Sequence, residues 1–570
     1  MMGGSSDGPA CGWWGACGIP GIDSFDREQV RGQRSLRSCV LLIGASVVVA
    51  ASLSPIALAQ LASPKRDIPE SFTRHFSTYA GGGNADSIGD ITVTDRGFLY
   101  VTGWTSSADF PTTPGAFDRT HNGGIDGFVL MLDPEGGLVW STFLGSAGSD
   151  LSLSIDVDRD GYVYVAGVGG RGFPTTPNSF QPGYHGYNET NATIAKLAPD
   201  GSALVWASYF GSAYQIRDIS LDDSNSELRL TSEYRPLDGQ PPFPQLSTPW
   251  FERAFQPNPQ GSNDVVVASV RADGAEVLWA TYLGGTGFDT PEASLAVDQD
   301  GSVYVAGATE SADFPTPNGF RSTYAGSSDA FLAKLSADGS ELKWGTFLGG
   351  VNRDGALGKH AVAVDRFGNA FLACDTASPD FPTLRGFQMT LGGGTSGNWS
   401  EVGDYAVSKF GPDGALLAST YVGGRFRDTG EGICLDRSNN VLLAGLTFSD
   451  DFPLGGVAHQ TNHHGDADGM FFKISSDLSR LLYSSFMGTS AYDACRSVGT
   501  NARGDFYFAG DTKSASWPTL NAFQSAYGGG RNDTFIVKFT SDSAKSFEPL
   551  DPRRRPIGRT PRSAPRHPNP

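Results

Sequence analysis

The residues with the clearest chemical potential are aspartates that recur along the chain. One set follows an aromatic-x-Gly element by seven residues, and the other precedes an apolar segment. The first set is Asp86, Asp150, Asp289, Asp354, Asp428 and Asp493, and the second is Asp126, Asp264, Asp329, Asp404, Asp468 and Asp533. Such carboxylates can bind a cation or a polar ligand, or they can accept backbone N–H groups. Because active sites are asymmetric, this regularity favours the structural role.

One segment has the beginning of a calcium-binding loop. Asp156, Asp158 and Asp160 match the Asp-x-Asp-x-Asp start of many such loops. The twelfth position of the loop is Gly167 rather than the glutamate of an EF-hand. The pattern therefore leaves two interpretations, a Ca²⁺ site formed by these three aspartates or an ordinary turn, and the chain offers no sign of another cofactor.

Residues that interrupt the repetition are better candidates for ligand binding. Charged side chains lie close in sequence to the repeated aspartates at Glu292, Arg353, Arg425, Arg427, Glu431 and Arg496. An enlarged connection adds Arg235 and Trp250, and arginine beside aromatic residues suits contact with a glycan or a protein. Another connection holds His459, His463, His464 and Asp466, which can bind zinc or lie in a surface loop.

Familiar catalytic signatures are absent from the sequence. There is no Gly-x-Ser-x-Gly, no His-Glu-x-x-His and no phosphate loop ending in Gly-Lys-Ser/Thr. Residues 167–172 match Gly-x-Gly-x-x-Gly, but Phe173-Pro174 follows and cannot open the helix that a dinucleotide site needs. We therefore assign no catalytic residue.

Two markers show that the elements carrying these residues are repeated seven times. The aromatic-x-Gly element recurs every 64 to 74 residues, at Tyr79, Phe143, Tyr209, Tyr282, Phe347, Tyr421 and Phe486. An aromatic-Pro pair alternates with it, at Phe110, Phe173, Phe243, Phe314, Phe381, Phe452 and Trp517. Internal repeats of this kind indicate a repeat architecture.

Each unit contains four short strand signals and no sustained helical period. In the fourth unit the expected strands are 294–298, 302–306, 330–335 and 341–348, and Asp338-Gly339 suits a type I′ hairpin turn. Four antiparallel strands repeated radially describe a blade of a β-propeller. The predicted fold is therefore all-β, a seven-bladed β-propeller over residues 60–545, whose central channel has the charged candidates at one mouth.

The two ends of the repeat predict how the ring closes. The last unit has three strand signals and no fourth, whereas Phe76–Tyr79 has no preceding unit to join. We expect this N-terminal strand to become the outer strand of the last blade, because that closure leaves no exposed edge between the first and last blades.

The motifs of the fourth unit resemble a known family. They are Thr281–Gly285, Ala296–Gly307, Asp313–Thr316 and Asp329–Leu335. Together they are similar to the SBBP β-propeller repeat family, and the resemblance extends over about residues 70–545, with the third unit departing most. It implies a secreted or cell-surface bacterial protein, usually without an assigned activity, and it carries over no catalytic residue.

The chain ends and the overall charge bear on location and partners. Arginines, an apolar run and Ala57-Leu58-Ala59 describe a secretory signal peptide over residues 1–59, with a membrane anchor as the alternative. Residues 546–570 form a basic, proline-rich tail that we expect to be disordered. The whole chain carries −19, residues 1–59 are balanced and the last twenty carry +5, which leaves −24 for the region between them. Such acidity argues against nucleic-acid binding.

These observations predict an exported, monomeric, non-enzymatic propeller that binds a glycan or a protein at the cell surface or envelope, whether secreted or periplasmic. The alternative is a secreted carbohydrate-active enzyme, a hydrolase or lyase, with its site at the channel mouth. Glycosidic chemistry would require two carboxyl groups roughly 5–10 Å apart.

Overall fold

The computed structural model describes residues 69–185, 190–222, 224–235, 249–289, 294–355, 361–393 and 403–542. Residues 1–67 and 68–570 form two separate units, and only the second contains described residues. The predicted signal peptide, the predicted basic tail and Glu292 lie outside the described residues. Within the described part, no helix is long and apolar enough to cross a membrane.

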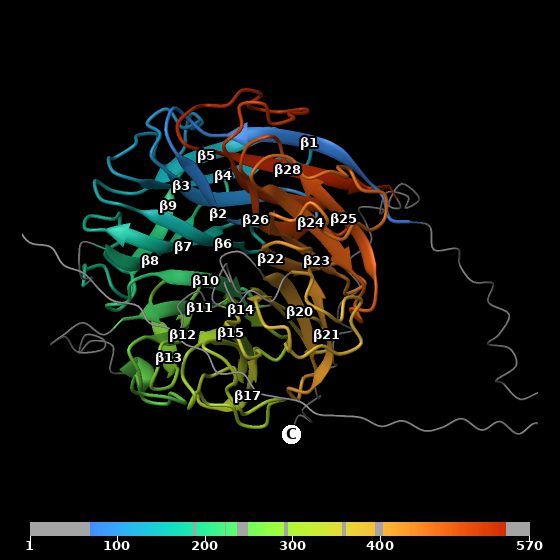
Figure 1. Ribbon diagram of the computed structural model, residues 1–570. Coiled ribbons are helices and arrows are strands. Elements are labelled where there is room, and N and C mark those ends of the chain that lie inside the picture. The colour runs from blue at the N-terminus through green and yellow to red at the C-terminus, as the bar shows by residue number, and fades with distance from the viewer. Residues whose placement is uncertain are drawn as a thin grey trace, which may run out of the picture. The chain divides into compact units, whose positions relative to one another are not determined.

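The described residues contain 28 strands in seven four-stranded antiparallel sheets, so the predicted seven-bladed β-propeller is confirmed (Figure 1). Blade 1 comprises β2 (Asp86–Val93), β3 (Leu99–Thr105), β4 (Asp126–Leu132) and β5 (Leu138–Leu144). Blade 2 comprises β6 (Leu151–Val157), β7 (Val163–Gly170), β8 (Thr190–Leu197) and β9 (Leu204–Tyr209). Blade 3 comprises β10 (Ile216–Leu221), β11 (Glu227–Tyr234), β12 (Asp264–Arg271) and β13 (Val277–Leu283).

The remaining blades repeat this order. Blade 4 comprises β14 (Ser294–Val297), β15 (Val303–Thr309), β16 (Asp329–Leu335) and β17 (Leu342–Leu348). Blade 5 comprises β18 (Ala361–Val364), β19 (Ala370–Thr376), β20 (Asp404–Phe410) and β21 (Leu416–Val422). Blade 6 comprises β22 (Asp428–Leu435), β23 (Val441–Thr447), β24 (Asp468–Ile474) and β25 (Leu481–Met487). Blade 7 comprises β26 (Asp493–Thr500), β27 (Phe506–Thr512), β28 (Asp533–Ser541) and β1 (Phe72–Ala80).

The hairpin turns differ from the sequence prediction in one respect. A type I′ turn needs a positive φ at both central residues, but only Gly339 of the Asp338-Gly339 pair has one, at 68°. Gly339 N donates to Ser336 O at 3.0 Å, and the ladder shifts register between Lys334 and Leu335. The turn is therefore a type I turn followed by a glycine and a bulge, and the type I′ prediction was wrong.

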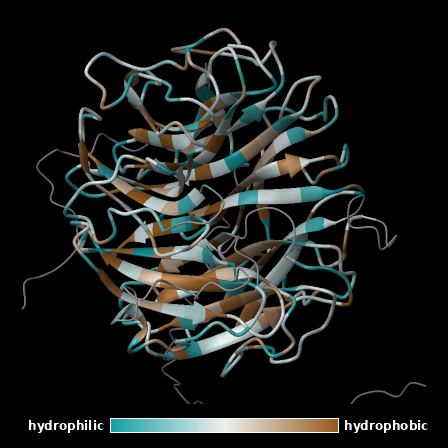
Figure 2. Cartoon of the chain, turned by 90° about the vertical axis from the view of Figure 1, so that its left-hand side faces the viewer, coloured by the Kyte–Doolittle hydropathy of each residue, from teal (hydrophilic) through white to brown (hydrophobic). Residues whose placement is uncertain are grey.

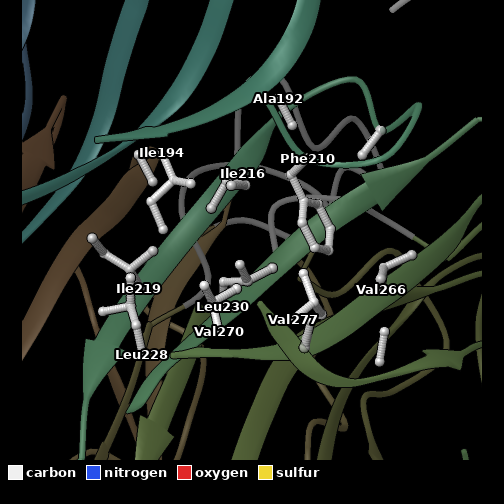
Figure 3. Close-up of a cluster of buried hydrophobic side chains, with 14 of the residues drawn as sticks. Ala192, Ile194, Phe210, Ile216, Ile219, Leu228, Leu230, Val266, Val270 and Val277 are labelled. Atoms are coloured by element: carbon white, nitrogen blue, oxygen red, sulfur yellow. The ribbon is translucent and has the colours of Figure 1, made fainter. Parts of the chain in front are cut away.

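The hydrophobic core lies between neighbouring blades. Figure 2 shows hydrophobic residues concentrated along the strands. One cluster joins blades 2 and 3, where Ile194 from β8 and Ile219 from β10 lie with Leu230 and Val270 (Figure 3). These side chains are at most 5 % exposed, and burying each contributes roughly 1.5–3 kcal/mol. Strands buried on both faces explain why β15, VYVAGAT, is an almost continuous apolar run.

The N-terminal strand closes the ring as predicted. β1 pairs antiparallel with β28, from Phe72 opposite Ser541 to Ala80 opposite Thr534, and the two strands lie side by side in Figure 1. The Tyr79 hydroxyl donates to Ser514 O at 2.7 Å and accepts from Trp517 N at 3.0 Å. Blade 7 therefore combines three C-terminal strands with the N-terminal β1, and this arrangement is stabilised by the ladder and by the buried Tyr79 side chain.

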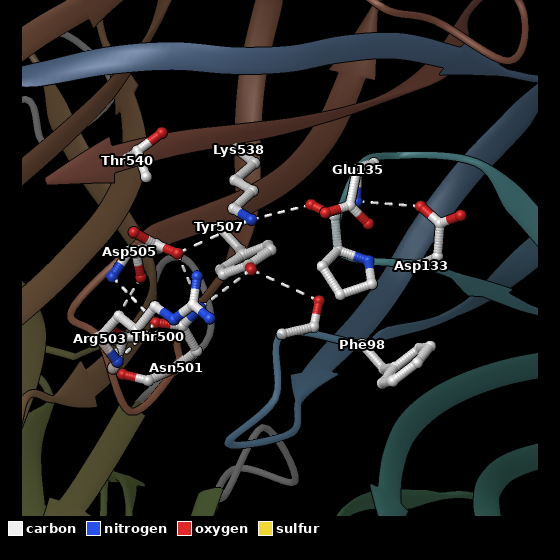
Figure 4. Close-up of polar contacts among 12 residues, drawn as sticks. Phe98, Asp133, Glu135, Thr500, Asn501, Arg503, Asp505, Tyr507, Lys538 and Thr540 are labelled. Atoms are coloured by element: carbon white, nitrogen blue, oxygen red, sulfur yellow. Dashed lines mark hydrogen bonds and ion pairs between the residues drawn. The ribbon is translucent and has the colours of Figure 1, made fainter. Parts of the chain in front are cut away.

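A polar contact completes the junction of blades 7 and 1 (Figure 4). Lys538 Nζ on β28 donates to Pro134 O at 2.8 Å and lies 3.7 Å from Asp505 Oδ2. The Tyr507 hydroxyl donates to Gly97 O at 3.4 Å. Since Pro134 and Gly97 belong to turns of blade 1, these bonds tie the last blade to the first.

Candidate functional site

The first strand of every blade faces a central cavity of about 390 Å³. These strands are β2, β6, β10, β14, β18, β22 and β26, whose labels cluster near the centre of Figure 1 where room allows. Because each is the inner edge of its sheet, its outward N–H groups need partners from outside the ladder. The cavity is thus lined by backbone donors as well as by side chains.

A ring of side chains satisfies many of these donors. At one register position, five blades carry a hydroxyl or a carboxylate: Asp90, Ser154, Asp218, Ser294 and Ser497. Each accepts the N–H of the next blade, at Ile155 (3.3 Å), Ile219 (3.2 Å), Leu295 (2.8 Å), Val362 (3.4 Å) and Ile91 (3.3 Å) respectively. This polar ring links the inner strands of neighbouring blades by hydrogen bonds.

The polar ring is interrupted in blades 5 and 6. The residues at the same register are Ala361, opposite Ala373, and Gly432, opposite Ala444. Neither residue type carries a hydrogen-bond acceptor in its side chain. The cavity therefore has one side that differs chemically from the others.

An ion-paired cluster lies next to this interruption. Arg496 Nη1 donates to Glu431 Oε1 at 2.9 Å, and Arg496 Nε donates to Asp511 Oδ2 at 3.1 Å. Burial by itself lowers the pKa of Arg496, but Glu431 and Asp511 more than offset it and raise that pKa above its usual value. Asp511 also accepts Ile88 N of blade 1 at 3.1 Å. The arginine is thus permanently charged and held rigidly.

Two of the predicted channel-mouth residues come together at the cavity, and three described ones, Arg353, Arg425 and Arg427, do not. Glu431 and Arg496 line it and bind one another. Arg353 and Arg425 lie in the loops before β18 and β22 and are absent from its lining. Arg425 is 55 % exposed and pairs with Asp450. That Arg353 and Arg425 bind a ligand stays a prediction.

Sequence reasoning missed Arg217, which also lines the cavity. It occupies the bulge of β10, between Ile216 and Asp218, just as Glu431 and Arg496 occupy the bulges of β22 and β26. The available signal was its place immediately before a polar-ring residue, but the departure of blade 3 from the repeat hid it.

The blade 3 candidates lie away from the cavity. Trp250 stacks on Phe210 with ring centroids 5.7 Å apart and packs against the core of blades 2 and 3. The Arg235 guanidinium pairs with buried Glu233 and lies 4.4 Å from the Tyr214 ring centroid. These contacts give both residues a structural role, and their predicted ligand contacts remain untested.

The three aspartates of the possible calcium loop do not converge. Asp156 accepts Leu221 N at 2.8 Å, and burial raises its pKa to about 6. Asp158 accepts Asp160 N and Tyr162 N in the β6–β7 turn. Among the described residues, no three His, Cys, Asp or Glu side chains form a group that could hold a metal ion. The three aspartates and the histidines before β24 are among these described residues.

The repeated aspartates have the structural role that their regularity predicts. The first set accepts backbone N–H groups at 2.6 to 2.8 Å and the second at 2.5 to 3.0 Å. Six seams between blades each hold one member of both sets: Asp533/Asp86, Asp126/Asp150, Asp264/Asp289, Asp329/Asp354, Asp404/Asp428 and Asp468/Asp493. They hold the connections between blades.

Comparison with known proteins agrees with this repeat. Residues 76–111 and 278–315 match the family model SBBP, described as a beta-propeller repeat. These two segments are therefore similar to SBBP repeats. The two matches contain the Phe110-Pro111 and Phe314-Pro315 pairs, and they fall in the first and fourth units. No curated protein matches the chain.

Solved structures resemble the chain at low similarity. Hydrazine synthase of Kuenenia stuttgartiensis is 8 % identical, with 78 % of this chain and 95 % of that chain covered and a TM-score of 0.40. The RRP9 WD40 repeats are 8 % identical, with 82 % and 100 % covered and a TM-score of 0.41. A Dyadobacter fermentans protein of unknown function is 10 % identical, with 82 % and 99 % covered and a TM-score of 0.37.

Proposed function

We propose that this protein is an exported, non-enzymatic binding propeller that holds its ligand, a glycan or a group on a protein, in the central cavity at the cell surface or envelope. One observation carries the proposal. Glu431 and Arg496 form an ion pair that lines the cavity, and this pair breaks the seven-fold repetition.

The cavity has the properties of a small-molecule site. Its volume of about 390 Å³ falls within the roughly 300–1,000 Å³ of ligand pockets. Ten of its 21 lining residues are polar or charged, and the others include apolar residues such as Ile91 and Leu435. The Glu431 side chain is 7 % exposed and the Arg496 side chain 28 % exposed, so both are pre-organised yet reachable. Such rigidity reduces the conformational entropy that the protein loses when a ligand binds.

The carboxylates of the cavity favour binding over hydrolysis. Glycoside cleavage needs one carboxyl group as an acid and a second as a base or nucleophile. Asp90 and Asp218 accept backbone N–H groups of neighbouring blades, and Glu431 accepts from Arg496. Each lining carboxylate therefore already holds the structure together, which suits a stable scaffold.

A glycan array probed with the protein tests the proposal directly. We expect at least one ligand, and we expect Arg496→Ala to weaken its binding about tenfold or more. Arg271→Ala, which removes an exposed arginine of β12 outside the cavity, should leave binding unchanged. Equal thermal stability of the two variants would show that folding is not the cause. Binding that survives Arg496→Ala, or release of reducing ends from the bound glycan, would contradict a non-enzymatic cavity site.

A further inference from the structure

The interruption of the polar ring exposes two backbone donors to the cavity. In five blades, the backbone N–H group one residue after the ring position donates a hydrogen bond to the ring side chain of the preceding blade, as Ile219 N does to Ser154 Oγ. In blades 6 and 7 the equivalent N–H groups are those of Ile433, opposite Leu443, and Val498, opposite Phe508. The ring positions of the blades that precede them are occupied by Ala361 and Gly432. Among the described residues, no side chain accepts from either N–H group, and both residues line the cavity.

Gly432 shows how directly the missing side chain leaves one donor open. A Cβ atom built on Gly432 would lie 3.1 Å from Val498 N. A serine at this position would therefore bring its hydroxyl beside that N–H, as Ser154 does for Ile219 N. With glycine in place, residue 432 offers no side-chain acceptor to Val498 N.

The groups around this gap determine what chemistry fits it. Ile433 N and Val498 N donate, Arg496 donates, and Glu431 is an acceptor beside Arg496. The charged residues of the lining are Asp90, Asp218, Glu431, Arg217 and Arg496, whose formal charges give no positive excess. An anion gains nothing from such a field, whereas a hydroxyl group both donates and accepts.

We propose that the gap in the polar ring is the specificity position of the cavity, where hydroxyl oxygens of an uncharged sugar-like polyol accept from Ile433 N and Val498 N while a neighbouring hydroxyl donates to Glu431. This inference rests on the proposed function, because it requires that the cavity binds a ligand. The apolar residues Ile91, Val93 and Leu435 supply the surface for the C–H groups of such a ligand.

Closing the gap by substitution tests the inference. Gly432 has no positive φ, so its backbone conformation admits serine and alanine. A Cβ atom there would lie 3.1 Å from Val498 N and 3.2 Å from Ser497 Cα, so both variants require the same small shift of β26 and differ only in the hydroxyl group. The probes are glucose, galactose, mannose and N-acetylglucosamine, with galacturonate and glucosamine as charged counterparts, titrated calorimetrically into the full chain. We expect a neutral sugar to bind, Gly432→Ser to weaken it about tenfold or more, and Gly432→Ala to weaken it by only about two- to threefold.

Amide signals give a readout that does not depend on affinity alone. In the ¹⁵N-labelled protein, the bound neutral sugar should shift the Ile433 and Val498 amides and slow their hydrogen exchange. Unmoved amides, equal losses for the serine and alanine variants, or tighter binding of a charged sugar would each overturn the inference. If a glycan binds and its affinity falls in Arg496→Ala but not in Gly432→Ser, the proposed cavity function stands and the proposed specificity position is refuted. If no sugar binds, both proposals are refuted.

Discussion

The carboxylates of Asp404 and Asp428 converge on the Cα atom of Gly423, at the seam between blades 5 and 6. A Cβ atom on Gly423 would lie 2.6 Å from Asp404 Oδ1 and 2.8 Å from Asp428 Oδ2. Both aspartates are at most 1 % exposed, and Asp404 Oδ1 has no hydrogen-bond partner among the described residues. Gly284 stands between Asp264 and Asp289 in the same way. The glycine of the aromatic-x-Gly marker is therefore required by the two carboxylates.

Gly423→Ala should destabilise the protein, because the added methyl group cannot fit without displacing a carboxylate. We expect a loss of about 2–3 kcal/mol in the free energy of unfolding, typical of overpacking. Urea denaturation measures it. Gly183→Ala is the matched control, since its nearest neighbour would be His185 Nε2 at 3.6 Å, and a surface change costs about 0.5 kcal/mol or less. Equal midpoints for the two variants would refute the steric requirement.

Stability should fall as the pH rises from about 4 to 8. Burial raises the pKa of Asp404 to about 7 and that of Asp428 to about 8, from a usual value of 3.8. In this range the folded state keeps protons that the unfolded state has lost, so each group lowers stability by at most about 1.4 kcal/mol per pH unit. Burial lowers the pKa of His459, so this residue alone would make stability rise with pH, but it is one group against several aspartates. Urea midpoints that rise from pH 5 to pH 8 would contradict the prediction.

Asn191→Asp should install a pH-sensitive defect at the seam between blades 2 and 3. Asn191 takes the place of the second aspartate there, and its Nδ2 donates to Ala213 O at 3.0 Å. A carboxylate would instead face that carbonyl, so we expect a loss of about 3 kcal/mol at pH 8. The loss should shrink at pH 5, where the protonated acid can donate. Exposed Asn462→Asp serves as the control, and a pH-independent loss would argue against this explanation.

A disulfide across the closing ladder should stabilise the folded ring. Thr73 and Thr540 are directly opposed on β1 and β28, and opposed antiparallel residues have Cα separations that a disulfide can span. The oxidised Thr73→Cys/Thr540→Cys variant should gain about 3–5 kcal/mol, and reduction should remove the gain. Thermal unfolding with and without reductant measures it, with Thr73→Cys alone as the control. Failure of the two cysteines to pair would contradict the closure.

The blade count, the strand order and the closure could all be predicted from the sequence, because two markers recur in every unit and only one strand was left over. The predicted strands of blade 4 match β14, β15, β16 and β17 to within a few residues. The second strand extends to Thr309 because its last residues still pair with Asp329–Phe331. Repetition averages out local ambiguity, which is why the fold was accessible.

The candidate site was only partly accessible, for a geometric reason. A β-bulge before Gly432 and before Ser497 shifts the side-chain alternation by one residue, and the sequence does not display it. The ring position also changes type from blade to blade, so no marker follows it. Conversely, Asp156 and Asp158 are close in sequence, but a strand and its turn direct them to different partners. Closeness in sequence suggested a shared site, but the geometry of the strand and its turn determines which partners these side chains reach.

The closing ladder has a mechanical consequence. Phe72, where the chain enters β1, stands opposite Ser541, where it leaves β28. A tension that draws the flanking segments apart therefore acts first on this one pair and then on each following pair, so the ladder opens like a zipper instead of shearing all its bonds together. Under load, the ring should yield at blade 7 and at low force, while the other six blades stay folded until that strand has left.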